Sequence, residues 1–72
     1  LHSVYVYPTT TTEQLNLSEP CQCFWIYTTD GTLALQGTAC QVVNVSVLAP
    51  ARYYISLRLV DGGVITLPFD KQ

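Results

Sequence analysis

The nine residues from Arg52 to Val60 carry an apolar side chain at every second position. The alternating apolar residues are Tyr53, Ile55, Leu57 and Leu59. Because successive side chains of a β-strand point to opposite faces, this period of two predicts a half-buried antiparallel strand. No stretch of ten or more residues shows the three-and-four apolar spacing of an amphipathic helix. The sequence therefore predicts an all-β fold.

Turn-forming residues divide the rest of the chain into short segments. Asp30-Gly31 and Asp61-Gly62-Gly63 predict hairpin turns, because glycine adopts positive φ at little steric cost. The predicted strands are Ser3–Tyr7, Gln14–Leu17, Cys21–Tyr27, Leu33–Gln36, Gln41–Ser46, Arg52–Val60 and Val64–Phe69. Seven short strands predict one domain over residues 1–72, a small seven-stranded antiparallel β-sandwich of immunoglobulin-like type. Pro68 has no backbone N–H, so we expect the last strand at a sheet edge or with this position turned outward.

Other residues are expected to interrupt the strands. Ser18-Glu19-Pro20 and Gly37 are expected to end the strands before them, and Thr9–Thr12 is expected to be a solvated loop. The residues expected in the core are Val4, Val6, Phe24, Ile26, Val43, Val45, Leu48, Tyr53, Ile55, Leu57 and Phe69.

Composition excludes several classes of protein. Hydrophobic residues make up 49% of the chain and charged residues 11%, which is opposite to the pattern of a disordered tail. Three basic residues are too few for a nucleic-acid-binding stripe. No apolar run is long enough to span a bilayer. The chain starts at Leu1 and contains no Met, so we expect it to be a fragment of a larger protein.

The sequence offers no catalytic or metal-binding constellation, and we expect neither enzyme activity nor a cofactor. His2 has no carboxylate near it in sequence, and no second pair of ligands accompanies it for a metal. Asp30 and Asp61 are explained as turn residues, because aspartate accepts local backbone hydrogen bonds.

The three cysteines form an odd set in a short chain. One interpretation is a disulfide that joins Cys40 to Cys21 or to Cys23, which would stabilise the fold by about 3 kcal/mol. The alternative is that all three are small buried apolar side chains. In a regular strand, the Cys-x-Cys spacing places Cys21 and Cys23 on the same face.

Four segments of the chain, taken in order, carry a more specific signal. VYVYPTTTTEQLNL places Tyr-Pro in a loop before a Leu-x-Leu strand, and FWIYTTDGTL is a hairpin with Asp-Gly at its tip. VNVSVLAPARYYISL and GGVITLPFDKQ complete the series. Together they resemble the C-terminal sorting domain of proteins exported by the type IX secretion system of Bacteroidetes. The positions that match the family's motifs are Tyr7, Pro8, Gly31, Leu48, Tyr53 and Lys71.

The chain departs from the family's pattern at two places. The family has Asn-Pro where Thr9 and Thr10 stand, and one proline fewer leaves a less restricted loop. The family has glycine where Ala51 stands, and alanine would cost energy there if the position required positive φ.

The resemblance implies recognition rather than catalysis. It implies that the domain directs its parent protein from the periplasm across the outer membrane to the cell surface or the medium. The implied partners are the type IX outer-membrane translocon or shuttle protein and a surface sortase. The alternative function is a retained docking or adhesive β-sandwich module of a surface protein, which binds protein or glycan.

Two groups of residues are candidates for partner contact. Alternation turns the aromatic residues Tyr5, Trp25 and Tyr54 outward, and aromatic residues are frequent at binding hot spots. The alternative for Trp25 is that it covers a sheet edge or lies in a strand with both faces covered. The resemblance implies that the tail residues Phe69, Asp70, Lys71 and Gln72 are read by the shuttle protein, whereas a frayed end is the alternative. An exposed edge strand would also allow a weak homodimer.

Overall fold

The computed structural model describes residues 4–72, and for residues 39 and 40 the description covers the backbone alone. The described residues form strands and turns without a helix, which confirms the predicted all-β class. The six strands are β1 (Val6–Tyr7), β2 (Thr10–Thr11), β3 (Gln14–Thr28), β4 (Leu33–Asn44), β5 (Ala51–Leu59) and β6 (Val64–Lys71). Their arrangement is compatible with a small β-sandwich.

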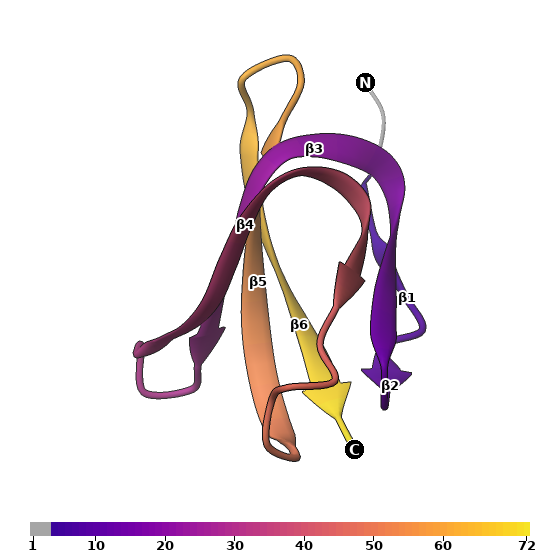
Figure 1. The fold of residues 1–72 in the computed structure, drawn as a ribbon. Helices are drawn as coiled ribbons and strands as arrows, with labels where there is room; N and C mark the ends of the chain where they lie inside the picture. Colours follow the sequence, from indigo (N-terminus) through magenta and orange to yellow (C-terminus); the bar gives the residue numbers. More distant parts are fainter. Residues whose placement is uncertain (1–3) are drawn as a thin grey trace.

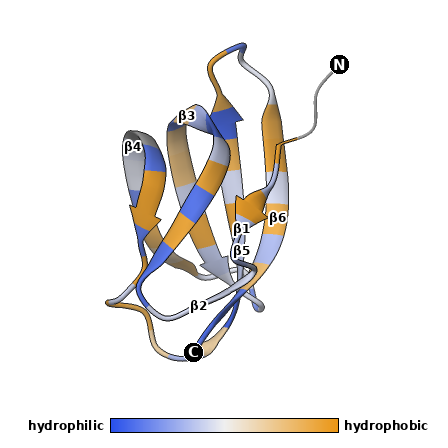
Figure 2. Cartoon of the chain, turned by 90° about the vertical axis from the view of Figure 1, so that its right-hand side faces the viewer, coloured by the Kyte–Doolittle hydropathy of each residue, from blue (hydrophilic) through white to orange (hydrophobic). Residues whose placement is uncertain are grey.

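Two long, bent strands connect the layers of the fold. Figure 1 shows β3 and β4 arching over together as one antiparallel hairpin. The first part of β3 pairs with β1 and with the end of β4. Its second part pairs with the start of β4 and with β5, which in turn pairs with β6. Both parts of β3, together with β4, β5 and β6, contribute buried apolar residues to one core. Figure 2 shows apolar residues alternating with polar ones along these strands.

The continuity of the long strands corrects the predicted boundaries. Gln14–Leu17 and Cys21–Tyr27 are two parts of β3, because a register shift between Asn16 and Cys21 accommodates Ser18-Glu19-Pro20 without ending the strand. Leu33–Gln36 and most of Gln41–Ser46 are likewise parts of β4, which continues through Gly37. These turn-forming residues bend a strand instead of ending it, because the pairing between β3 and β4 resumes beyond them.

The Thr9–Thr12 run is a further correction. Thr10 and Thr11 form β2, which pairs with β6 in parallel, so the sheet is not wholly antiparallel. The predicted start of the first strand at Ser3 lies outside the described residues, and β1 covers only Val6 and Tyr7.

The core agrees with the predicted inward faces at every position except Val4, which is only partly buried. The core also contains Leu15 and Leu17, which were not predicted, Leu59, which follows from the alternation in Arg52–Val60, and Cys21, whose burial agrees with one interpretation of the cysteines. The core members Tyr53 and Phe69 stand opposite each other on β5 and β6, with ring centroids 5.7 Å apart.

The turns and the edge agree with expectation. Gly31 and Gly62 have φ of 91° and 94°, which confirms both hairpin turns. No described residue other than glycine has positive φ, so alanine is unstrained at position 51. Pro68 pairs with Tyr54 of β5 on one side, and β2 covers β6 only at Asp70 and Lys71 on the other. Pro68 therefore occupies an edge, where a missing N–H costs no hydrogen bond.

Candidate functional site

The short strand β2 and the end of β6 meet at one end of the fold. Thr10 and Thr11 lie opposite Asp70 and Lys71, and the amide of Asp70 donates to the Thr9 carbonyl at 2.7 Å. The amide of Gln72 donates to the Thr11 carbonyl at 2.8 Å. The accessible residues around this contact are called the terminal patch below. They are Thr9, Thr10, Thr12, Arg52, Asp70 and Gln72.

Local side-chain bonds hold β2 in place. The Tyr7–Pro8 peptide bond is cis, and Thr11 is buried, with its hydroxyl donating to the carbonyl of Gln14. Thr11 therefore faces inward, whereas its threonine neighbours are exposed. Because all four residues of the run are threonine, no alternation of apolar and polar residues could predict which of them is buried.

The tail candidates do not share one environment. Phe69 is 1% exposed and belongs to the core, and Lys71 is 8% exposed, with its Nζ donating to the Gln72 carbonyl at 2.9 Å. Neither side chain is presented for a partner in this structure, and the last strand is paired rather than frayed. Asp70 is accessible, and its carboxylate accepts from Arg52 Nε at 3.1 Å.

A second surface lies on the outer face of the β3–β5 sheet. The register places Tyr27 opposite Tyr54, with Leu33 and Pro68 at the two ends of this row. These four residues are called the aromatic row. The neighbouring row consists of Gln36, Trp25, Ser56 and Thr66.

Exposure differs among the aromatic side chains of this face. Tyr54 is 38% exposed, whereas Trp25 and Tyr27 are half-buried on the central strand. Tyr27 was not among the predicted contact residues, although the alternation that turns Trp25 outward applies equally to it. Ser56 and Thr66 hydroxyls lie 2.9 Å apart, so the face mixes aromatic rings with neutral hydrogen-bonding groups.

Tyr5 does not join this face. It is exposed just before β1, and its ring lies 5.8 Å from that of Tyr7. Because β1 pairs with β3 at Asn16 and Leu17, Tyr5 belongs to the part of the fold before the bend. The three outward aromatic residues thus form two separate surfaces.

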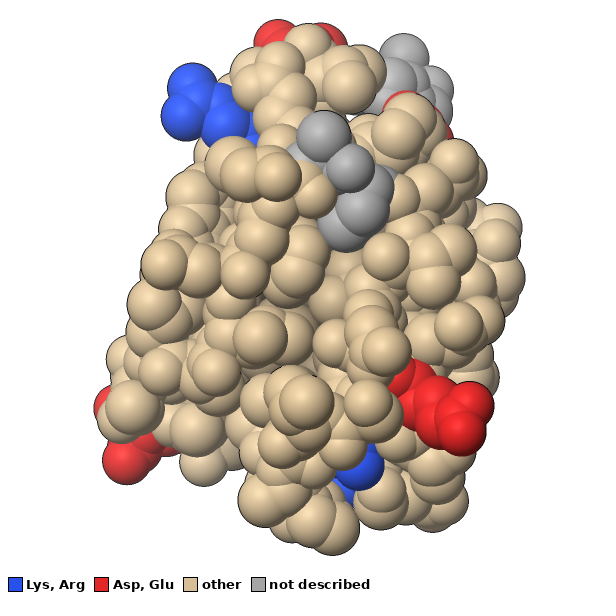
Figure 3. Space-filling model, viewed as in Figure 1, with Lys and Arg blue, Asp and Glu red and all other residues tan. Residues whose placement is uncertain are grey.

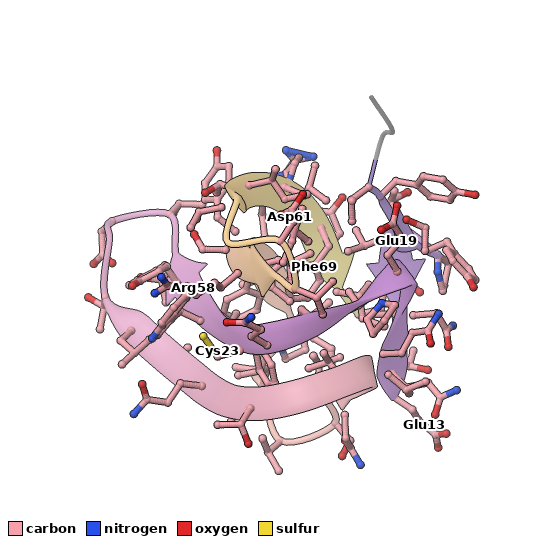
Figure 4. All side chains as sticks on the ribbon, turned by 90° about the horizontal axis from the view of Figure 1, so that it is seen from above. Glu13, Glu19, Cys23, Arg58, Asp61 and Phe69 are labelled. Carbon is pink, nitrogen blue, oxygen red and sulfur yellow. The ribbon has the colours of Figure 1, made fainter. Side chains whose placement is uncertain are left out.

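The cysteines of the Cys-x-Cys segment lie on different faces, contrary to the regular alternation. A register shift against β5 separates them, so that Cys21 stands opposite Leu59 in the core and Cys23 stands opposite Arg58. Figure 4 shows Cys23 and Arg58 on the same side of the fold. On β4, the backbone of Cys40 stands opposite Cys21.

The described residues contain no pocket and no cluster of histidine, cysteine or acidic residues able to hold a metal ion. His2 lies outside the described residues. Asp61 accepts the Gly63 amide at 2.9 Å, as a turn residue should. Hydrogen bonds from the Thr28 and Thr32 side chains and the Thr32 amide lower the pKa of Asp30.

No family model and no curated protein matches this chain. In the described part, no helix has the length and apolarity that a membrane crossing requires.

Proposed function

We propose that this chain is a C-terminal sorting domain, read as a folded surface by the type IX secretion machinery, which carries the parent protein across the outer membrane. The observation that carries the proposal is the pairing of β2 with β6. It joins the Tyr-Pro segment to the Lys-bearing strand, two of the four segments on which the resemblance rests. A partner protein could therefore contact both segments at one place.

The third segment has a structural explanation that supports the same proposal. The Tyr53 hydroxyl donates to the Ala49 carbonyl at 2.6 Å, and Leu48 is buried beside this turn. A tyrosine that bonds back to the chain before its own strand fixes the corner of a β-sandwich. Tyr53 also stacks on Phe69, so this corner supports the strand that carries the tail.

The terminal patch supplies the contact groups in this proposal. Arg52 and Asp70 are about half exposed, and their mutual attraction is therefore worth about 1 kcal/mol or less. A translocon groove of matching charge could exchange this ion pair for contacts of its own at little cost. Because Phe69 and Lys71 are structural, deleting the last four residues would damage the fold and could not isolate recognition.

The experiment fuses the chain to the C-terminus of a periplasmic reporter in a bacterium that has type IX secretion. We expect the reporter at the cell surface or in the medium, and in the periplasm of a translocon-defective strain. The mass of the exported reporter tells whether a sortase removes the domain. A folded reporter that stays in the periplasm of the competent strain contradicts the proposal.

Two matched variants separate the patch from the fold. The double charge exchange Arg52→Asp with Asp70→Arg keeps an ion pair while inverting the charges, and we expect it to impair export. The exchange Thr66→Ser on the opposite part of β6 should leave export unchanged. If both variants are exported as efficiently as the wild type, recognition must lie on another surface.

The outer face of the sheet supports a second function, a retained adhesive module that binds neutral glycans. The aromatic row and its neighbouring row contain no charged residue, and aromatic rings beside neutral hydrogen-bonding groups suit sugar faces. Insoluble cellulose and chitin are suitable probes. We expect Tyr54→Ala to reduce binding and Tyr5→Ala to leave it unchanged.

Trp25→Ser distinguishes binding from packing on this face. Reduced polysaccharide binding with unchanged melting indicates a contact residue. A lower melting temperature with unchanged binding indicates that Trp25 packs over its neighbours. If neither measurement changes, Trp25 has neither role.

A further inference from the structure

The outer edge of β4 is open along the whole strand. β4 pairs with β3 on one side, and among residues 4–72 no strand pairs with its other side. Figure 4 shows β4 as the outermost ribbon of the bent hairpin. The backbone N–H and C=O groups directed outward from this edge can therefore accept a further strand.

This edge lacks two of the features that normally prevent strand addition, charge and proline, and the register shift that adds a residue on β4 lies at Ala34, near the start of the strand. The twelve residues of β4 include no charged residue and no proline. Figure 3 shows a broad area without charged atoms across the middle of the face seen in Figure 1, with charged side chains above, to the left and below it. By contrast, the opposite edge strand β6 carries Pro68 and is covered by β2 at its end. Natural sheets guard long edges with charge or proline, so an unguarded edge indicates a pairing surface.

The pattern along β4 is self-complementary in the antiparallel sense. Leu33 and Val42, near its two ends, are 44% and 50% exposed. Between them, Gln36 and Thr38 are exposed and neutral. A twofold axis near Thr38 places Leu33 of one copy toward Val42 of the other and brings polar residues together at the centre. No like charges then face each other. A strand with charged residues, paired with a second copy of itself, would bring like charges close together.

We propose that two copies of this chain pair through β4, antiparallel and across a twofold axis near Thr38, to form one continuous sheet. The pairing satisfies the outward backbone groups of β4 and covers Leu33 and Val42. The inference is independent of the proposed secretion function, because it requires only a second copy.

The test uses opposite charges at the centre of β4. Thr38→Lys and Thr38→Glu each place like charges near each other in a homodimer, and each should weaken dimerisation at least about tenfold. An equimolar mixture of the two variants should dimerise again. The measurement is sedimentation equilibrium of wild type, each variant and the mixture, with circular dichroism to verify folding.

A control and a reserve pair keep the test decisive. Val64→Lys, on the exposed outer face of β6, should leave dimerisation unchanged. If a variant at position 38 does not fold, Gln36→Lys and Gln36→Glu replace the pair. A wild-type chain that remains monomeric up to its solubility limit overturns the proposal. So does a mixture that stays monomeric, or dimerisation that Val64→Lys abolishes.

Discussion

The ring of Phe24 occupies the space that a β-carbon at Gly37 would need. The two residues lie opposite each other on β3 and β4, and a β-carbon built at Gly37 would stand 2.6 Å from Phe24 Cε2. Gly37 therefore serves neither a turn nor positive φ. It lets a core aromatic ring lie directly over the backbone of the edge strand.

Gly37→Ala should consequently destabilise the domain by roughly 1–3 kcal/mol, because the buried Phe24 ring must move. Urea unfolding followed by tryptophan fluorescence measures the change. Thr12→Ala, at an exposed position outside β4, is the control, with an expected change within about 0.5 kcal/mol. In a Phe24→Leu background Gly37→Ala should cost less, and an equal cost would contradict a clash with the ring.

Tyr53→Phe removes only the hydroxyl that bonds to the Ala49 carbonyl. We expect a loss of about 1 kcal/mol in the free energy of unfolding, typical of one net hydrogen bond. Tyr54→Phe is the control, because Tyr54 is exposed on the same strand. Equal effects of the two changes in chemical denaturation would argue against a stabilising corner.

The β3–β4 register selects between the two cysteine pairings that the sequence leaves open. Cys21 stands directly opposite Cys40, whereas Cys23 stands opposite Thr38. Opposite residues of an antiparallel pair have the short Cα separation that a disulfide requires. Under oxidising conditions we expect a Cys21–Cys40 bond and an alkylatable Cys23 thiol in non-reducing peptide mapping. A Cys23–Cys40 peptide would contradict the register.

Asp30 provides a test of the first hairpin tip. Its pKa is lowered because its ionised carboxylate accepts hydrogen bonds from the Thr28 side chain and from Thr32. The charged form thus favours the folded state, and this contribution is present above the unfolded pKa and lost as the pH falls through the lower folded pKa, below about pH 4.

Carbon-detected NMR titration of the Asp30 carboxyl measures this pKa directly. Thr28→Val removes the largest cause and should raise the Asp30 pKa toward its usual value. Thr12→Val, a change of the same kind at an exposed threonine elsewhere, should not alter it. An Asp30 pKa that is identical in wild type and Thr28→Val would contradict the assigned hydrogen bond.

Local features of this protein could be predicted from the amino-acid sequence. Alternation in Arg52–Val60 placed Tyr53, Ile55 and Leu57 inside, because the two faces of a strand follow directly from backbone geometry. Asp-Gly at positions 30 and 31 placed a hairpin turn, because its conformation depends on the residues that form it.

Features that depend on pairing between distant segments could not be predicted in this way. Ser18-Glu19-Pro20 is a bend within β3 rather than its end, because β4 pairs with β3 on both sides of this segment and β5 replaces β1 as the other neighbour beyond it. A register shift against β5 separates the faces of Cys21 and Cys23, and the last strand recruits Thr10 and Thr11 into the sheet. Alternation is read within one strand, whereas bulges, parallel partners and open edges depend on which strands become neighbours.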